Sequence, residues 1–263
     1  MLHYEIHGVD GPRVVLIQGV GVTGQGWSPQ VEALSEAFQL LVLDNRGIGG
    51  SADHDGAILI EEMARDVQDV MDDAGWDSAH IAGHSMGGVI AQQVALDAPK
   101  RVESLALLCT FARAKDGARV TPWIIWIGMR SRIGTRAMRR RAFLELVVTP
   151  EFVANRGAEQ VADELADVFG RDLADQPNIA MKQVQALGRH DTSQRLGELG
   201  GIPTLVVSAE RDLIALPEYG RQLEAAIPGA NYVQLDGTAH ACTVDRAADI
   251  NRLLSEHWNS VND

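Results

Sequence analysis

The pentapeptide Gly83-His84-Ser85-Met86-Gly87 decides the fold prediction, because it stands between a short apolar segment and a helix-like stretch that ends at Pro99. A G-x-S-x-G sequence at a strand-to-helix turn is typical of a serine nucleophile whose hydroxyl is exposed at the tip of the turn. Glycines on either side let the strand and the helix approach closely, since no Cβ atoms intervene. The start of the helix would point backbone N–H groups at the site. We therefore predict that Ser85 is a catalytic nucleophile.

Short apolar segments rich in Val, Leu and Ile recur along the chain and do not alternate cleanly with polar residues. This pattern indicates strands buried on both faces, as in a parallel sheet covered by helices. The segments are Val14–Gln18, Gln39–Asp44, His80–Gly83, Leu105–Cys109, Thr204–Ser208 and Tyr232–Leu235. The helix-like stretches that alternate with them are Ile60–Ala74, Met86–Ala98, Leu216–Ile227 and Ala247–Trp258. The alternation predicts an α/β fold with a doubly wound, mostly parallel sheet.

Two further features refine the predicted architecture. Tyr4–His7 and the Asp10-Gly11 turn predict a small antiparallel hairpin at the N-terminal edge of the sheet. Between residues 112 and 196 the strand pattern stops, and apolar residues recur mostly at helical spacing. We predict that residues 112–196 form a helical cap inserted into a core made of residues 1–111 and 197–263.

The predicted cap contains two candidate functional features. Trp123 and Trp126 are candidate substrate-binding residues, and they could equally form the core of the cap itself. A basic cluster between Arg130 and Arg141 could attract an anionic substrate or partner. The alternative for this cluster is a solvated helix face paired with nearby acids.

Composition excludes several classes of protein. The chain of 263 residues has a net charge of −13, whereas a general nucleic-acid binder needs a basic surface. Cys109 and Cys242 are the two cysteines, and they lack a CxxC spacing, so we expect buried thiols in a reducing compartment. Residues 1–8 lack the apolar run of a signal peptide, and no apolar run has the ~20 residues of a membrane helix. We expect a cytoplasmic protein with no nucleic-acid or membrane partner and of unknown oligomeric state.

A serine nucleophile needs a base that is oriented by a carboxylate. On this type of fold the acid and then the histidine follow the serine along the chain. Asp212 comes just after one predicted strand, and His240 follows the next one, so both lie at the sheet edge of Ser85. Glu210 is the rival acid, and we favour Asp212. Of the eight histidines, we select His240 because it alone has this order and this edge.

The oxyanion of an acyl-transfer site needs backbone donors. One is the N–H of Met86, which follows the nucleophile, and we assign the other to Val20 in the loop of residues 18–24. The same loop also carries a G-x-G-x-x-G sequence, with Asp44 20 residues beyond its last glycine, which is the form of a dinucleotide-binding fingerprint. That interpretation leaves Ser85, Asp212 and His240 as three coincidences, so we favour the hydrolase.

These motifs resemble the α/β-hydrolase superfamily over nearly the whole chain. The family pattern D-x-R-G-x-G-x-S is present at Asp44-Asn45-Arg46-Gly47-Ile48-Gly49-Gly50-Ser51, whereas the usual His-Gly of the early loop is replaced by Gln18-Gly19. Within the superfamily the sequence is similar to bacterial carboxylesterases, enol-lactonases and cofactor-free haloperoxidase-like esterases. It does not resemble haloalkane dehalogenases or epoxide hydrolases, which have an aspartate at the position of Ser85. The resemblance implies that the insertion is a helical cap over the active site.

The sequence thus predicts a cofactor-free serine carboxylesterase that acts on a small-molecule ester through an acyl-enzyme. No cluster of metal ligands is visible, so no metal is expected. A lactonase, a thioesterase or a C–C bond hydrolase would use the same triad. The alternative from another class is a non-catalytic ligand-binding protein on this fold.

Overall fold

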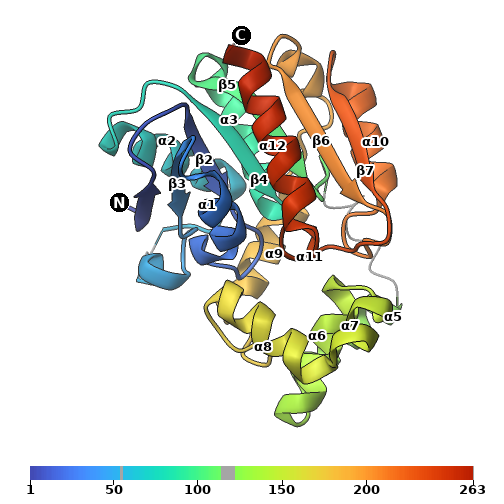
Figure 1. Cartoon of the computed structure of the whole chain (residues 1–263). Helices are drawn as coiled ribbons and strands as arrows, with labels where there is room; N and C mark the ends of the chain where they lie inside the picture. The colour runs from blue at the N-terminus through green and yellow to red at the C-terminus, as the bar shows by residue number, and fades with distance from the viewer. Residues whose placement is uncertain (54–55, 114–121, 263) are drawn as a thin grey trace.

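A computed structural model of the chain describes residues 1–53, 56–113 and 122–262, with side chains left out at 122–125 and 262. In these described residues, seven strands form one sheet in the order β1-β3-β2-β4-β5-β6-β7 (Figure 1). The strands are β1 Tyr4–His7, β2 Arg13–Ile17, β3 Gln39–Leu43, β4 Ala79–His84, β5 Val102–Leu108, β6 Thr204–Ala209 and β7 Asn231–Leu235. All neighbours pair in parallel except β1 and β3, so the predicted α/β fold with a mostly parallel sheet is confirmed.

Burial explains the continuous apolar character of the central strands. Every residue of β4 and of β6 is buried, as are the last four residues of β2. Helices on both sides of the sheet remove these strands from water, so neither face needs polar side chains.

The predicted N-terminal hairpin is wrong in its partner. β1 pairs antiparallel with β3, where Tyr4 lies opposite Leu43, and it does not pair with β2. Both edges of β2 are already occupied, by β3 on one side and by β4 on the other. The free edge of β3 is therefore the place where β1 can complete its hydrogen bonds.

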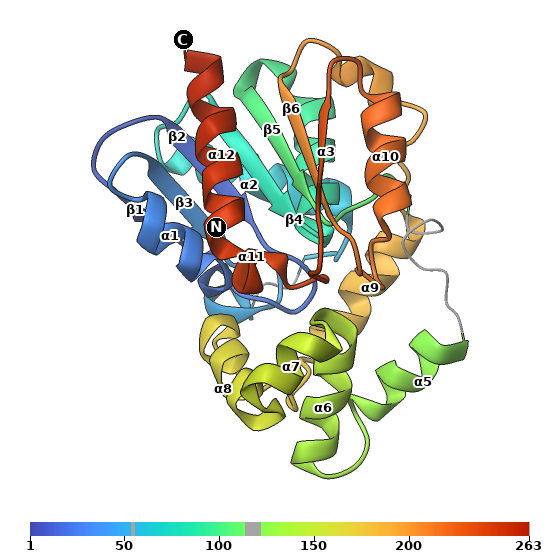
Figure 2. The same ribbon diagram turned by 45° about the vertical axis from the view of Figure 1, so that its right-hand side comes forward.

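Two layers of helices cover the sheet, as Figures 1 and 2 show. α1 and α12 contact each other on one face, and α2 and α3 contact each other on the opposite face. α2 buries a single apolar stripe, which includes Ile60, Met63, Val67 and Met71. The helices around the sheet are α1 Ser28–Leu34, α2 Ile60–Asp73, α3 Met86–Asp97, α10 Pro217–Ala226, α11 Cys242–Asp245 and α12 Ala247–Asn262.

The helices that come between β5 and β6 in the sequence lie beyond the carboxyl ends of the strands (Figure 2). These helices are α5 Pro122–Arg130, α6 Arg136–Val147, α7 Pro150–Arg156, α8 Ala158–Phe169 and α9 Ile179–Arg189. They have their own apolar cluster, which Val22 and Ala241 join from the loops of the sheet. The division into a core and a cap at residues 112 and 196 stays a prediction. None of the described helices combines the length and the apolar character that crossing a membrane requires.

Candidate active site

Ser85 occupies a strained turn between β4 and α3. Its φ is +56° and its ψ is −119°, backbone angles that a residue with a Cβ atom rarely adopts. A Cβ on Gly83 would overlap the carbonyl of Gly87, and a Cβ on Gly87 would overlap the carbonyl of Ile17. Both glycines are therefore required by the close approach of strand and helix. Strain of this kind costs about 1–3 kcal/mol and is concentrated at functional sites.

His240 and Asp212 form a buried pair at the same sheet edge. His240 Nδ1 lies 2.7 Å from Asp212 Oδ2, and Asp212 is 1% exposed. The second carboxylate oxygen, Oδ1, accepts the N–H groups of Ile214 and Ala215 at 2.8 and 2.9 Å. These two hydrogen bonds hold the carboxylate in place. The carboxylate in turn orients His240, so that Nδ1 contacts Asp212 and the other ring nitrogen, Nε2, is left for a different partner.

The rival acid, Glu210, has a different neighbour. Its carboxylate is exposed and accepts the backbone N–H of Gly237 at 2.8 Å. The structure therefore brings Asp212, and not Glu210, against His240.

His84 holds the loop of His240, a contact that the sequence analysis missed. His84 Nε2 lies 2.9 Å from the backbone oxygen of His240, and the two ring centroids are 4.8 Å apart. Burial lowers the pKa of His84 to about 3, and the neighbouring His240 adds to the shift. His84 is therefore neutral near pH 7 and can donate its Nε2–H to this carbonyl. The sequence signal for a role of His84 is that it directly precedes Ser85.

The hydroxyl of Ser85 is close to the loop of residues 18–24. A Cβ built on Gly19 would lie 3.0 Å from Ser85 Cβ and 3.5 Å from Ser85 Oγ. Within the described residues, Ser85 Oγ forms no hydrogen bond with His240. Such bonds are often long when no substrate is present and tighten in the complex.

The two predicted oxyanion donors belong to residues that directly follow Ser85 and Gly19 in the chain. Met86 is the first residue of α3, where the backbone N–H groups have no partner within the helix. Val20 follows Gly19 directly, and neither Val20 nor Met86 donates its N–H to another described residue. Gln18, which replaces the usual family histidine, accepts the N–H of Gly19 on its side-chain oxygen at 3.1 Å. The backbone N–H groups of Val20 and Met86 thus have no partner among the described residues, and their role as oxyanion donors stays a prediction.

The part of the chain between β5 and β6 holds this loop through both polar groups of Gly21, with one partner on α9 and the other in the connection between α8 and α9. Gly21 N–H donates to Gln183 Oε1 at 2.8 Å, and Gly21 O accepts from Arg171 Nε at 3.0 Å. Gln183 is fully buried on α9, and its amide nitrogen also donates to the carbonyl of Arg46. No local sequence pattern identifies these residues, because Gln183 lies 162 positions from Gly21.

Asp44 ties two loops together, which argues against the dinucleotide-binding interpretation. Its carboxylate oxygens accept the N–H of Gly24 at 2.7 Å and the N–H of Gly50 at 2.8 Å. A dinucleotide fingerprint needs this carboxylate for a ribose and a helix that begins at the glycines. Here a short 3-10 helix, Gly24–Trp27, intervenes before α1.

The candidate substrate-binding tryptophans are placed only in part. Trp123 belongs to α5, but its side chain lies outside the described residues. Trp126 is 48% exposed, and the guanidinium carbon of Arg130 lies 4.5 Å from its ring centroid. Their role in substrate binding stays a prediction.

The two cysteines are free and buried, with their sulfur atoms 3.4 Å apart. Ring or sulfur atoms of His84, Cys109 and His240 lie within 4.8 Å of one another. Each of these side chains already has a partner, in His240 O, Cys242 Sγ and Asp212 Oδ2 respectively. We therefore assign no metal site to this group.

A strained serine at a strand-to-helix turn, followed along the chain by a paired aspartate and histidine, defines the α/β-hydrolase class. A family model for the alpha/beta hydrolase fold matches residues 12–136. The chain belongs to the α/β-hydrolase family and is a hydrolase.

The similar proteins include a curated relative and solved structures. “Putative carbamate hydrolase RutD” of Azorhizobium caulinodans is 33% identical over 260 residues, which are 96% of this chain and 93% of the relative. The enol-lactonase of Burkholderia xenovorans LB400 is 28% identical with a TM-score of 0.81, covering 98% of this chain and 96% of its own. Est816, an N-acyl homoserine lactone degrading enzyme, is 25% identical with a TM-score of 0.80, covering 97% and 96%.

Proposed function

We propose that this hydrolase is a carboxylesterase with Ser85 as nucleophile, His240 as general base and Asp212 as the acid that orients it. The observation that carries the proposal is the 2.7 Å bond between His240 and the buried Asp212, at the sheet edge where Ser85 occupies its strained turn. A neutral imidazole that donates Nδ1–H to Asp212 presents Nε2 as a proton acceptor.

The mechanism follows from these positions. Ser85 Oγ attacks the ester carbonyl while His240 removes its proton, and the N–H groups of Val20 and Met86 stabilise the oxyanion. His240 then protonates the leaving alcohol as the bond from the acyl carbon to the alcohol oxygen breaks. Water, activated by the same histidine, attacks the acyl-enzyme and releases the acid. No step requires a cofactor.

The second candidate substrate class is a carbamate. The similar curated protein carries the name of a carbamate hydrolase, and similar solved structures are lactone-cleaving enzymes. A carbamate or a lactone carbonyl would be attacked in the same way. The reactions differ in the leaving group and in the acyl group that stays bound to Ser85. A thioester or a C–C bond substrate uses the same triad. A purely ligand-binding role is less favoured, because it leaves the strained serine without a purpose.

A matched substrate series tests the proposal. Rates are measured for phenyl acetate, phenyl thioacetate, phenyl N-methylcarbamate and γ-butyrolactone, each with the native protein and with Ser85→Ala. We expect the ester to have the highest kcat/KM. Ser85→Ala should reduce the hydrolysis of every substrate that the native protein cleaves to the background rate. A fluorophosphonate probe should label native Ser85 and leave Ser85→Ala unlabelled. A higher kcat/KM for the carbamate would make the carbamate the substrate class, and absence of labelling would reject the nucleophile.

A further inference from the structure

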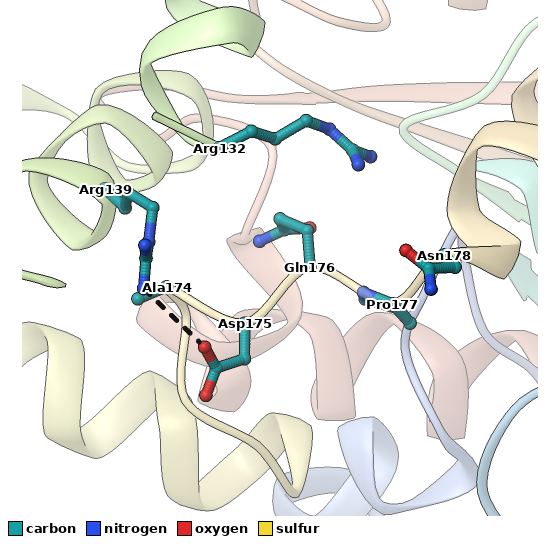
Figure 3. A pocket seen from close by; sticks show the side chains of 7 residues that line it. All are labelled: Arg132, Arg139, Ala174, Asp175, Gln176, Pro177 and Asn178. Atoms are coloured by element: carbon teal, nitrogen blue, oxygen red, sulfur yellow. Dashed lines mark ion pairs between the residues drawn. The ribbon is translucent and has the colours of Figure 1, made fainter. Parts of the chain in front are cut away.

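A polar cavity of about 460 Å³ lies between the α5–α6 turn and the segment that leads into α9 (Figure 3). It is lined by Arg132, Arg139, Ala174, Asp175, Gln176, Pro177 and Asn178. Figure 3 shows the side chains of Arg132 and Arg139 on opposite sides of the hollow, with Gln176 between them. The lining thus contains two guanidinium groups and one carboxylate, which leaves an excess positive charge in a protein with a net charge of −13.

Arg132 differs from its neighbours in the basic cluster. The other arginines of the cluster form ion pairs with acids, namely Arg130, Arg136, Arg139, Arg140 and Arg141. This pairing matches the expected solvated face for most of the cluster. Arg132, however, is exposed and forms no ion pair with any described residue. Its five N–H donors are therefore available to a ligand.

Arg139 is also incompletely satisfied. Its Nη2 lies 3.8 Å from Asp175 Oδ1, and its Nη1 donates to the carbonyl of Gly134 at 3.3 Å. Its Nε is buried and has no hydrogen-bond partner in the described part of the chain. The contacts of the two outer nitrogens are long, so a ligand carboxylate could replace or share them.

Amide groups complete the polar lining. Asn178 directly precedes α9 and forms no side-chain cap with that helix. Gln176 donates its amide nitrogen to the carbonyl of Leu173 at 2.9 Å, and no described donor reaches its amide oxygen. The start of α9 adds a partial positive charge at this edge of the cavity.

The cavity is separated from the nucleophile by one loop. A Cβ on Gly21 would lie 3.3 Å from Pro177 Cγ in the cavity wall, and a Cβ on Gly19 would lie 3.0 Å from Ser85 Cβ. Gly19 and Gly21 are two residues apart in the same loop. The loop of residues 18–24 therefore contacts both the turn of Ser85 and the wall of the cavity, and the acyl length that joins the two places is set by testing a series of chain lengths.

We propose that this cavity binds a carboxylate at the far end of the substrate, and that the hydrolase therefore prefers esters whose acyl chain ends in a carboxylate. A planar carboxylate matches the fork of donors on a guanidinium, and such charge-assisted bonds are the strong ones. The inference rests on the proposed ester hydrolysis at Ser85.

The test compares methyl half-esters with neutral esters of the same length. The half-esters are monomethyl glutarate, adipate, pimelate and suberate, and their partners are methyl pentanoate to methyl octanoate. We expect the ratio of kcat/KM, half-ester over neutral ester, to exceed about ten at the chain length that spans the loop. A ratio of one or less at every length overturns the inference and leaves the proposed function intact. Failure to hydrolyse either series rejects the proposed function instead.

Arginine variants locate the effect. Arg132→Met and Arg139→Met keep the long apolar stem and remove the charge, and each should lower the ratio by about tenfold. Arg141→Met is the matched control, because Arg141 is exposed, pairs with Glu145 and does not line the cavity. An equal fall in Arg141→Met would show a general effect of charge and overturn the inference.

A binding measurement separates recognition from catalysis. Calorimetry with Ser85→Ala protein uses the half-ester that shows the highest ratio and its neutral partner. We expect tighter binding of the half-ester, and the added change Arg132→Met should remove the difference. Equal affinity for the two ligands overturns the inference, whatever the rates show.

Discussion

Ser85 adopts a backbone conformation that only glycine adopts freely, with φ at +56°. The neighbouring glycines have no room for a Cβ, so the position of Ser85 Oγ is imposed by the chain around it. Ser85→Ala should therefore keep the fold and reduce ester hydrolysis to background, a loss of at least about 10³-fold. Circular dichroism and steady-state rates check both parts. A variant that retains more than a few per cent of native activity would remove Ser85 as the nucleophile.

Asp212 and Glu210 provide a matched pair of acids. Asp212→Asn should lower kcat by about 10³–10⁴-fold, because an amide holds the imidazole in the wrong tautomer. Glu210→Gln should change kcat less than about threefold, since Glu210 contacts the backbone of Gly237 and not His240. Comparing kcat of the two purified variants checks this. The opposite ranking would make Glu210 the acid.

The positions of the candidate triad residues could be predicted because each follows a local pattern, a serine between glycines or a polar residue after a buried strand. The supporting contacts could not. His84 reaches the backbone of His240 across 156 positions, and Arg171 reaches Gly21 across 150. Such contacts depend on how the elements pack, which a single sequence does not encode in any short segment.

At the scale of elements, a hydrogen bond between Gln183 of α9 and the loop after β2 connects the helices beyond the sheet to the proposed oxyanion site. Gln183 fixes the peptide that joins Val20 to Gly21, next to the proposed oxyanion donor. Gln183→Leu should lower kcat by about tenfold with little change in KM, because loss of an oxyanion donor itself costs about 10²–10³-fold. Gln183→Glu keeps the acceptor oxygen for Gly21 N–H, but it loses the donor to the carbonyl of Arg46 and buries a charge, so it should recover only part of the loss. Steady-state kinetics check the split between kcat and KM.

Gln185→Leu is the control for this prediction, because Gln185 is exposed on the same helix. It should behave as the native protein does. If Gln183→Leu changes only the melting temperature, or if both leucine variants lose kcat equally, then Gln183 does not position the loop.

The strands show which parts of the fold a sequence can predict. The central strands were identified because burial on both faces leaves a continuous apolar run, and β4 matches the prediction within one residue at each end. The partner of β1 was not identified, because pairing depends on which strand edge is free in the complete sheet. The helices after β5 were predicted only as a group, since their spacing shows periodicity but not boundaries.

At the scale of the whole molecule, burial of neutral histidines should make the fold sensitive to acid. Burial lowers the pKa of His84 to about 3 and that of His257 to about 4, and it also lowers the pKa of His80. Between pH 6.5 and pH 4 the unfolded chain binds protons on His84 and His257, whereas the folded chain keeps these two side chains largely neutral. The free energy of unfolding should therefore fall as the pH is lowered through this range, by about 1.4 kcal/mol per pH unit for each such histidine.

Asp245 has the opposite effect, and the contrast provides the test. Burial raises the pKa of Asp245 to about 6, so the folded chain keeps a proton that the unfolded chain loses near pH 4. Asp245 therefore favours folding as the pH falls through 6, and this favourable contribution is lost as the pH rises. Urea unfolding at pH 8, 6.5 and 5 measures the balance. His257→Leu should reduce the loss of stability between pH 6.5 and pH 5, and Asp245→Asn should increase it. The same pH dependence in both variants and in the native protein would show that neither group is responsible.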